Sequence, residues 1–200
     1  MVKLYGVRQS RASRCLWMLE ELGIPYEHVP THFHDDTKKA EYLEVNPNGR
    51  VPALVDGELK LFESLAINLY LARKYGGDGP LGLPTIESEA LAVQWSLWAM
   101  TEVEPALYAY LMNGFVLPEA ERDPAARDRG FEALRRPLAV LEGQLEKRPY
   151  LLGDRFSVAD LNVASVLSWA KMARLDLSPH PKLRTWLDVC VKRPAALRAR

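Results

Sequence analysis

The hydrophobic pattern of the first 75 residues alternates between short strands and amphipathic helices. Val2–Val7 and Tyr26–Val29 are short apolar runs of strand length. Between them, Ser10–Gly23 repeats apolar residues at helical spacing and ends at a Gly-Ile-Pro sequence, which stops a helix. These segments predict a strand, a helix and a second strand in that order.

The next stretch predicts a short helix, a hairpin and a longer helix. Lys38–Val45 has helical spacing and ends at an Asn-Pro-Asn-Gly turn. Val51–Val55 and Glu58–Leu61 are strands on either side of an Asp-Gly pair, the strongest hairpin signal in the chain. Glu63–Tyr75 is helical again, so the predicted order of this half is βαβαββα.

A break in the pattern follows, because Gly76–Pro84 contains four glycines and two prolines in nine residues. This composition predicts an interdomain linker at 78–84, with one domain at 1–77 and another at 85–200. The stretch also contains the spacing G-x-G-x-x-G. A nucleotide-binding loop is excluded because the motif follows a helix rather than a strand and includes Pro80.

Beyond the linker the pattern is helical throughout, so the fold class is α/β plus all-α. Ser157 and Asp160 resemble a capping box, which marks a helix start rather than a catalytic pair. The predicted helices span about Thr85–Gly114, Asp123–Lys147, Ser157–Ala173 and Pro181–Lys192.

Composition argues against a nucleic-acid-binding, membrane-spanning or secreted protein. The 26 Lys and Arg balance 26 Asp and Glu, so no general positive field favours a nucleic-acid partner. No apolar run approaches the roughly 18 residues of a membrane span, and the N-terminus lacks a secretory signal. Cys15 and Cys190 fit neither a disulfide framework nor a zinc site, and we expect two buried thiols in a cytoplasmic protein.

Polar residues at two strand–helix boundaries are candidate ligand contacts. Ser10 and Ser13 follow the first strand, where a hydroxyl can cap the helix or bind an anion. Glu63 and Ser64 precede the third helix, where they can form a cap. With the helix amides they also suit a ligand that carries both an ammonium and a carboxylate, as an α-amino acid terminus does. No G-x-S-x-G motif is present, so a nucleophilic serine is not expected.

Three further features allow more than one interpretation. Val51-Pro52 opens a strand with a residue that cannot donate a ladder hydrogen bond, and its peptide is either trans, which the local chemistry favours, or cis. A cis peptide would present the Val51 backbone to an extended ligand. The group His32-Phe-His-Asp-Asp36 is typical of a solvated loop, and no metal is expected. Trp95, Trp98, Tyr108 and Tyr110 are expected in the core or at an interface, with some as an aromatic wall for a flat apolar ligand.

Four stretches combine into one pattern. They are Leu4-Tyr-Gly with Ser10 and Ser13-Arg-Cys-Leu, Asn46-Pro with Gly49-Arg-Val-Pro-Ala-Leu54, Leu61-Phe-Glu-Ser-Leu-Ala-Ile67, and the Ser157-Val-Ala-Asp160 box. In this order and spacing they resemble the glutathione transferase family, over essentially the whole chain. The resemblance implies a thioredoxin-like N-terminal domain that binds glutathione and an all-α C-terminal domain that lines the electrophile site.

The resemblance also implies roles for individual residues. Pro52 is implied to be cis, which reverses the local preference, and Val51 to pair with the cysteinyl backbone of glutathione. Glu63 and Ser64 are implied to hold the γ-glutamyl end. Lys38 and Arg50 are implied to lie near the glycine carboxylate.

The residue that activates the thiol is implied to be Ser10, with Ser13 as the alternative. Tyrosine-type members carry a tyrosine after the first strand, whereas Tyr5 lies within it, so the chain is similar to serine-type theta and phi members. The phi pattern has one more residue between its serine and its arginine. Gln9-Ser10-Arg11 lacks most of the zeta pattern, which argues against maleylacetoacetate isomerase activity, and Cys15 lies too far into the helix to match beta members.

We therefore expect a cytoplasmic, homodimeric glutathione transferase that acts in detoxification. Its co-substrate would be glutathione, with no prosthetic group, and its partner a small electrophile or peroxide, with no nucleic acid or membrane partner. The Trp95–Met100 stretch is expected to be partly buried in the dimer. Two alternatives remain: a non-catalytic binding or stress-regulatory protein of this type, and a glutathione-dependent isomerase or dehalogenase.

Overall fold

The computed structural model describes residues 1–200 and divides into two compact units. Unit 1 comprises Met1–Ile86 together with Arg193–Arg200, and unit 2 comprises Glu87–Lys192. This division differs from the predicted domains 1–77 and 85–200 at both boundaries. The last residues of the chain return to the N-terminal unit, which the sequence pattern did not indicate. No helix is both long enough and apolar enough to cross a membrane.

The predicted linker is a packed turn of unit 1. Leu81 and Leu83 are buried, and the Arg73 guanidinium donates to the Leu83 carbonyl at 3.2 Å. A side chain at Gly82 would place its Cβ 1.9 Å from the Gly77 carbonyl oxygen, so only glycine fits there. Gly76 and Gly82 therefore allow close backbone packing in this turn.

A four-stranded mixed sheet forms the centre of unit 1, in the order β2-β1-β3-β4. β1 pairs in parallel with β2 and antiparallel with β3, which pairs antiparallel with β4. The strands are β1 (Val2–Tyr5), β2 (Tyr26–Val29), β3 (Ala53–Asp56) and β4 (Leu59–Phe62). Because Ala53 lies opposite both Tyr5 and Phe62, the end of β1, the start of β3 and the end of β4 meet at one edge of the sheet.

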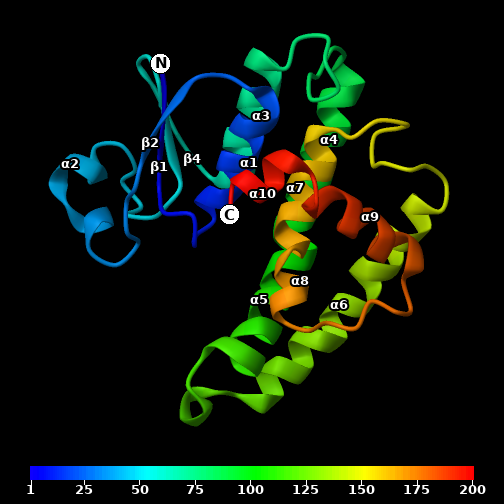
Figure 1. Ribbon diagram of the computed structural model, residues 1–200. Coiled ribbons are helices and arrows are strands. Elements are labelled where there is room, and N and C mark those ends of the chain that lie inside the picture. The colour runs from blue at the N-terminus through cyan, green and yellow to red at the C-terminus, as the bar shows by residue number, and fades with distance from the viewer. The chain divides into compact units, whose positions relative to one another are not determined.

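The helices of unit 1 complete the predicted thioredoxin-like order βαβαββα. α1 and α3 pack against each other, and Figure 1 shows α10 beside α1. The helical segments are α1 (Ala12–Leu22), the 3₁₀ turn η1 (Asp36–Lys38), α2 (Ala40–Leu43), α3 (Ser64–Tyr75) and α10 (Pro194–Arg198).

Unit 2 is all-helical, as predicted, and begins with one long helix that contains two π-helical segments. α5 and α6 lie very close at Gly130, which has no side chain. A Cβ there would come within 2.7 Å of the Ala106 carbonyl oxygen. The segments are α4 (Ile86–Trp98), η2 (Ala99–Val103), α5 (Glu104–Leu111), η3 (Met112–Val116), η4 (Glu119–Glu121), α6 (Pro124–Leu145), α7 (Val158–Leu167), α8 (Trp169–Met172) and α9 (Pro181–Val191).

The predicted capping box is present at the start of α7, a helix that is buried along its whole length. The Asp160 carboxylate accepts hydrogen bonds from the Ser157 backbone and hydroxyl, at 2.9 and 2.5 Å. It also accepts from the Leu151 amide and from Trp186 Nε1, both at 2.9 Å. Burial raises the pKa of Asp160, although these donors oppose the shift. Asp160 is therefore a structural hub that ties α7 to α9.

A second carboxylate, Asp56, ties the β3–β4 hairpin to the end of α3. Its side chain is 9% exposed, and Oδ2 accepts from Tyr70 Oη at 2.8 Å, Lys74 Nζ at 2.7 Å and Tyr75 Oη at 2.6 Å. Burial alone would raise the pKa of Asp56, but the three hydrogen bonds outweigh it and hold the pKa at about 2.

The Asp56 pKa predicts a pH-dependent stability. The depressed value means that its contribution is present above the ordinary pKa of 3.8 and is lost as the pH falls toward 2. Asp56→Asn should lower the free energy of unfolding by about 1.5–3 kcal/mol at neutral pH, the usual cost of losing charged hydrogen bonds. Denaturant titrations across this pH range should show the difference from wild type shrinking below pH 4. Glu27→Gln, which breaks the exposed Lys3–Glu27 pair, should change the free energy of unfolding much less than Asp56→Asn does.

Candidate ligand site at the edge of the sheet

The edge where β1, β3 and β4 meet brings together residues that are far apart in the sequence. Gly6 follows β1 there with a φ of +134°, which side-chain-bearing residues rarely adopt. A Cβ at Gly6 would lie 2.6 Å from Ala12 Cβ, 3.2 Å from Val51 Cβ and 3.6 Å from Ser10 Oγ. The absence of a side chain at Gly6 therefore allows the Ser10 loop and the Val51-Pro52 segment to approach each other. The sequence analysis gave Gly6 no role, although a glycine directly after a strand is a signal of close approach.

Ser10 lies in the loop after β1, just before α1. Its amide and its hydroxyl both donate to the Val7 carbonyl, at 3.1 and 2.7 Å. Its Oγ accepts the Ala12 amide at 3.1 Å, so Ser10 supplies a cap bond at the start of α1. The side chain is half-buried and lies beside the helix N-terminus.

Ser13 occupies a different position, inside the first turn of α1. Its hydroxyl donates to the Ser10 carbonyl at 2.9 Å. The sequence left open which serine is the N-cap, but the structure places Arg11 there, and Ser10, one residue earlier, accepts the Ala12 amide. Ser13 instead stabilises the turn that carries Ser10.

The Val51–Pro52 peptide is cis, as the family resemblance implied and against the local preference. Pro52 is buried and Val51 is half-buried. The preceding carbonyl, that of Arg50, accepts Tyr42 Oη at 2.6 Å and Asn46 Nδ2 at 2.7 Å. These bonds fix the segment that leads into β3.

Glu63 has an unusual backbone conformation between β4 and α3, with φ 69° and ψ 109°. A non-glycine residue at positive φ costs about 1–3 kcal/mol, and such residues cluster at ligand sites. Its carbonyl accepts the Ile67 amide at 2.9 Å, but its carboxylate makes no cap hydrogen bond and is exposed. The sequence allowed Glu63 to be a simple cap. The structure instead presents its carboxylate to solvent at the sheet edge.

Ser64 begins α3 and is buried. Arg14 Nη1 donates to Ser64 Oγ at 3.4 Å, and Cys15 Sγ lies 3.4 Å from the Ser64 carbonyl oxygen. Burial raises the pKa of the Cys15 thiol far above its ordinary value, so this thiol stays protonated and is not a nucleophile. Cys190 is also buried, which confirms the expectation of two buried thiols.

Lys38 and Arg50 lie on two segments that touch. A Cβ at Gly49 would come within 3.2 Å of the Thr37 carbonyl oxygen, so the residues next to each cation are in contact. Lys38 and Arg50 are both exposed, and neither has a carboxylate within ion-pair distance, whereas the neighbouring Lys39 pairs with Asp36 at 2.6 Å. Two cations are thus available to an anionic ligand near the start of β3.

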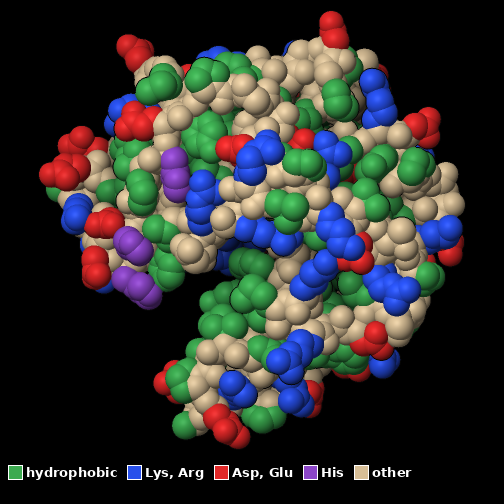
Figure 2. Space-filling view, viewed as in Figure 1, with side chains coloured by type: hydrophobic (Ala, Val, Ile, Leu, Met, Phe, Trp, Pro, Cys, Tyr) green, Lys and Arg blue, Asp and Glu red, His purple; other side chains and the backbone are tan.

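The histidine-rich segment before η1 is an exposed turn. The His32 amide donates to Asp36 Oδ2 at 2.9 Å. Figure 2 shows histidine and acidic side chains together on the surface around α2. They do not form a group of three or more residues that could hold a metal ion.

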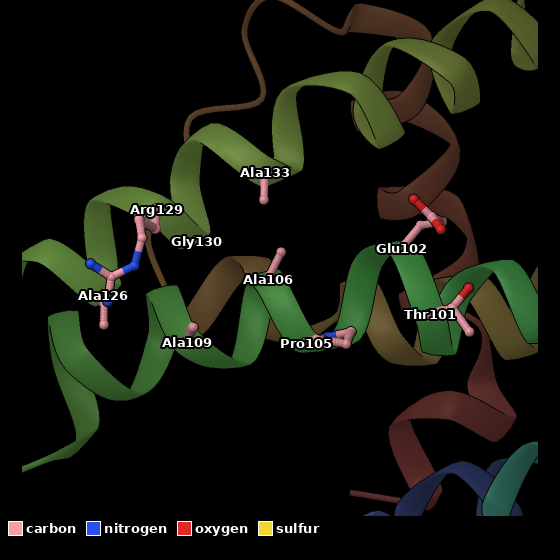
Figure 3. Close-up of a pocket in the computed structure, with 9 residues that line it drawn as sticks. All are labelled: Thr101, Glu102, Pro105, Ala106, Ala109, Ala126, Arg129, Gly130 and Ala133. Carbon is pink, nitrogen blue, oxygen red and sulfur yellow. The ribbon is translucent and has the colours of Figure 1, made fainter.

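Unit 2 contributes a recess between η2–α5 and α6, with a volume of about 440 Å³ (Figure 3). Small side chains line most of it, so its floor is largely helix backbone. Its two charged residues, Glu102 and Arg129, lie toward opposite ends. The complete lining is Thr101, Glu102, Pro105, Ala106, Ala109, Ala126, Arg129, Gly130 and Ala133.

Aromatic residues of unit 2 fall into a buried and an exposed set. Trp95 is 7% exposed and forms an edge-to-face pair with Trp98 at 5.1 Å between centroids. Tyr108 is exposed and lies 6.1 Å from the Trp169 ring. Tyr110 is half-buried between other aromatic rings, so the sequence-predicted aromatics divide between the core and an apolar surface.

Comparison with known proteins gives a family match for each half of the chain. The family model "Glutathione S-transferase, N-terminal domain" matches residues 1–73, and "Glutathione S-transferase, C-terminal domain" matches residues 99–194. Glutathione S-transferase 1 of Zea mays is 36% identical over 97% of this chain and 93% of its own length. Glutathione S-transferase GstB of Escherichia coli (strain K12) is 35% identical over 98% of this chain and 95% of its own length.

Solved structures extend the similarity to three dimensions. The structure of glutathione S-transferase-I with bound lactoylglutathione matches with a TM-score of 0.88 at 35% identity, over 99% of this chain and 97% of that one. A theta class glutathione S-transferase from Xanthomonas axonopodis pv. citri, with glutathione bound, matches with a TM-score of 0.89 at 30% identity. That match covers 99% of this chain and 96% of the other.

Proposed function

This chain belongs to the glutathione transferase family and is a glutathione transferase, in which we propose that Ser10 stabilises the glutathione thiolate. The observation that carries the proposal is the meeting of Ser10 and Val51 at Gly6, beside the N-terminus of α1. A peptide ligand held by the Val51 backbone would have its side chain near the Ser10 hydroxyl. We infer that this side chain is the cysteinyl thiol of glutathione, acting as co-substrate.

The hydrogen bonds of Ser10 suit a donor that can turn toward a ligand. Its hydroxyl hydrogen points to the Val7 carbonyl, while its oxygen accepts the Ala12 amide. A hydroxyl rotates about its C–O bond at little cost, so the hydrogen can leave Val7 for a thiolate. The Ala12 bond remains in place and polarises the hydroxyl, which strengthens it as a donor.

The expected shift in the pKa of the bound thiol follows from the usual free energies of a charged hydrogen bond and a helix dipole. A free thiol has a pKa of about 8.5, and one unit corresponds to about 1.4 kcal/mol. A hydrogen bond to a charged group contributes about 1.5–3 kcal/mol, and the α1 dipole adds to it. Ser10 and the start of α1 together should therefore lower the pKa of the bound thiol by about one to two units.

The γ-glutamyl end of glutathione carries an ammonium and a carboxylate, and the start of α3 offers a partner for each. Glu63 presents an exposed carboxylate from a strained backbone, which suits the ammonium. Ser64 is the first residue of α3, so its amide has no acceptor within the helix and is available to the carboxylate together with its hydroxyl.

The rest of the tripeptide would extend along the start of β3. Val51, which precedes the cis Pro52, would pair with the cysteinyl backbone. Lys38 and Arg50, which have no carboxylate partners in the chain, would hold the glycine carboxylate. The theta class neighbour has glutathione bound, which supports glutathione as the ligand.

The reaction would be attack of the thiolate on a small electrophile. The sulfur lone pair forms a C–S bond, and the leaving group departs with its electron pair, or the electrons enter an unsaturated acceptor that then takes a proton. The exposed rings of Tyr108 and Phe115 offer an apolar surface for a flat electrophile.

Mutation of the two serines separates their roles. Ser10→Ala should raise the pKa of the bound thiol by about one to two units and lower turnover at neutral pH. Part of the lost rate should return at high pH, because hydroxide then ionises the thiol. The measurements are ultraviolet titration of enzyme-bound glutathione and the pH profile of kcat/KM with a chromogenic electrophile.

Ser13→Ala is the matched control. Its hydroxyl bonds only to the Ser10 carbonyl in the structure, so it should cost about 1 kcal/mol of stability or less and keep the thiol pKa. If Ser13→Ala raises the pKa and Ser10→Ala does not, the donor is Ser13. If neither shifts it, backbone amides hold the thiolate and the serine-type assignment is wrong.

Glu63→Ala tests the γ-glutamyl contact. Loss of a charged hydrogen bond should weaken glutathione binding by about 1.5–3 kcal/mol, or roughly tenfold or more, with the fold intact. Isothermal titration with glutathione measures the effect, and Glu58→Ala on the neighbouring hairpin is the control. An unchanged dissociation constant for Glu63→Ala would remove this residue from the site.

We also propose that the protein is a homodimer. Val93 and Leu97 lie four residues apart on one exposed face of α4, and Leu97 is 60% exposed. On β4, which is an edge strand, Leu59 and Phe62 are also exposed. Apolar surfaces of this kind support an isologous interface, although Trp95 is already buried within the subunit.

Light scattering tests the dimer. The expected mass at micromolar concentration is twice the 22.6 kDa of the chain. Leu97→Asp should shift the protein toward the monomer, because it places a charge in the proposed interface. Val189→Asp, on an exposed apolar residue of α9, should leave the mass unchanged. A wild-type mass near that of one chain would contradict the proposal.

A further inference from the structure

The last eight residues of the chain form a C-terminal clasp, Arg193–Arg200, on unit 1. The helix within it, α10, packs against α1 (Figure 1). Ala195, Ala196 and Ala199 are all buried, so small side chains allow a close approach. The clasp therefore belongs to the N-terminal unit, although the whole of unit 2 separates it from that unit in the sequence.

The first anchor of the clasp is a two-point ion pair. The Arg193 guanidinium donates to both carboxylate oxygens of Glu21, at 2.5 and 2.8 Å. Trp17 Nε1 also donates to Glu21 at 2.9 Å, and the Glu21 side chain is only 9% exposed. Partial burial and two-point geometry make this pair stronger than an ordinary surface salt bridge.

The second anchor lies one residue earlier on α1. Arg198 Nε donates to Glu20 Oε2 at 2.6 Å, and Tyr26 Oη donates to the other oxygen at 2.7 Å. The hydrogen bond from Arg198 lowers the pKa of Glu20 most, and the bond from Tyr26 lowers it further. The carboxylate therefore stays ionised at neutral pH. The two anchors hold both ends of α10.

One hydrogen bond joins the clasp to the loop that carries Ser10. The Arg8 guanidinium donates through Nη1 to the Arg198 carbonyl oxygen. Arg8 lies directly after Val7, whose carbonyl accepts both the amide and the hydroxyl of Ser10. The Arg8 side chain therefore connects the clasp to the Ser10 turn.

We propose that Arg8 is a positioning residue and that the C-terminal clasp, through the Arg198 carbonyl, holds the turn from which Ser10 donates to the thiolate. This inference rests on the proposed role of Ser10. When the Ser10 hydroxyl turns toward the sulfur, it gives up its bond to Val7, and the Val7 carbonyl retains only its bond from the Ser10 amide. The Arg8 anchor therefore matters most in the thiolate state.

This difference between states predicts a specific kinetic signature. An interaction that matters only after the thiol ionises changes kcat more than the binding of glutathione. Arg8→Met should raise the pKa of the bound thiol by about half to one unit, and kcat at neutral pH should fall by about three- to tenfold. The KM for glutathione should stay within about twofold, and the rate should recover at high pH.

Two controls accompany Arg8→Met. Lys3→Met removes another exposed cation from the same unit, one that pairs with Glu27 at 2.9 Å, and should change neither the pKa nor kcat. Arg8→Lys keeps a cation and a donor, and should recover part of the lost rate. Thermal unfolding of each variant verifies that the fold is retained.

A double-mutant cycle separates positioning from simple charge. A chain that ends at Lys192 lacks the Arg198 carbonyl, so Arg8→Met should have no further effect on the thiol pKa in that background. If Arg8 acts only through its charge, the effect keeps its full size in the shortened chain. Should the shortened chain fail to fold, Arg198→Met replaces it, because it releases the Glu20 anchor and should reduce the effect of Arg8→Met.

The outcomes distinguish the positioning role of Arg8 from the donor role of Ser10. A normal thiol pKa in Arg8→Met, together with a raised one in Ser10→Ala, overturns the positioning role and leaves Ser10 as the donor. An effect of Arg8→Met that is fully additive with loss of the clasp also overturns it. If Ser10→Ala leaves the thiol pKa unchanged, the assignment of Ser10 fails first, and the role of Arg8 fails with it.

Discussion

The close approach around Gly6 is the constraint on which the site depends. Antiparallel pairing brings the end of β1 to the start of β3, and the missing side chain at Gly6 lets Ser10, Ala12 and Val51 gather there. A methyl group in this space would meet Ala12 Cβ at 2.6 Å, so either the first helix or the Val51 segment would have to move. The position of Ser10 relative to the Val51 segment therefore depends on one residue without a side chain.

At the other end of the site, the strained backbone of Glu63 lies next to the buried contact between Ser64 and Arg14. Glu63 sits at positive φ while the residue after it, Ser64, is buried and bonded to Arg14. Firm packing of Ser64 and α3 explains how an unfavourable conformation at Glu63 persists, since the surrounding structure determines it. The packing of α3 against α1 thus fixes the position of the exposed Glu63 carboxylate.

The two units are stabilised by different kinds of long-range contact. In unit 2 a single buried carboxylate, Asp160, links the α7 capping box to Leu151 and to Trp186 on α9. In unit 1 exposed and half-buried ion pairs close the chain on itself, with Arg193 and Arg198 returning to α1. The C-terminal residues are therefore part of the N-terminal unit.

Periodicity and turn chemistry alone determined the order βαβαββα, the helical second half, the Asp-Gly hairpin and the Ser157–Asp160 box, because each depends on residues a few positions apart. Motif order also pointed to the family and to the cis Pro52. Only the tertiary structure decided that Ser10 meets Val51 at Gly6, that Glu63 adopts positive φ, and that residues 193–200 join unit 1. These features depend on contacts between segments far apart in the chain, and local sequence carries no signal for such contacts.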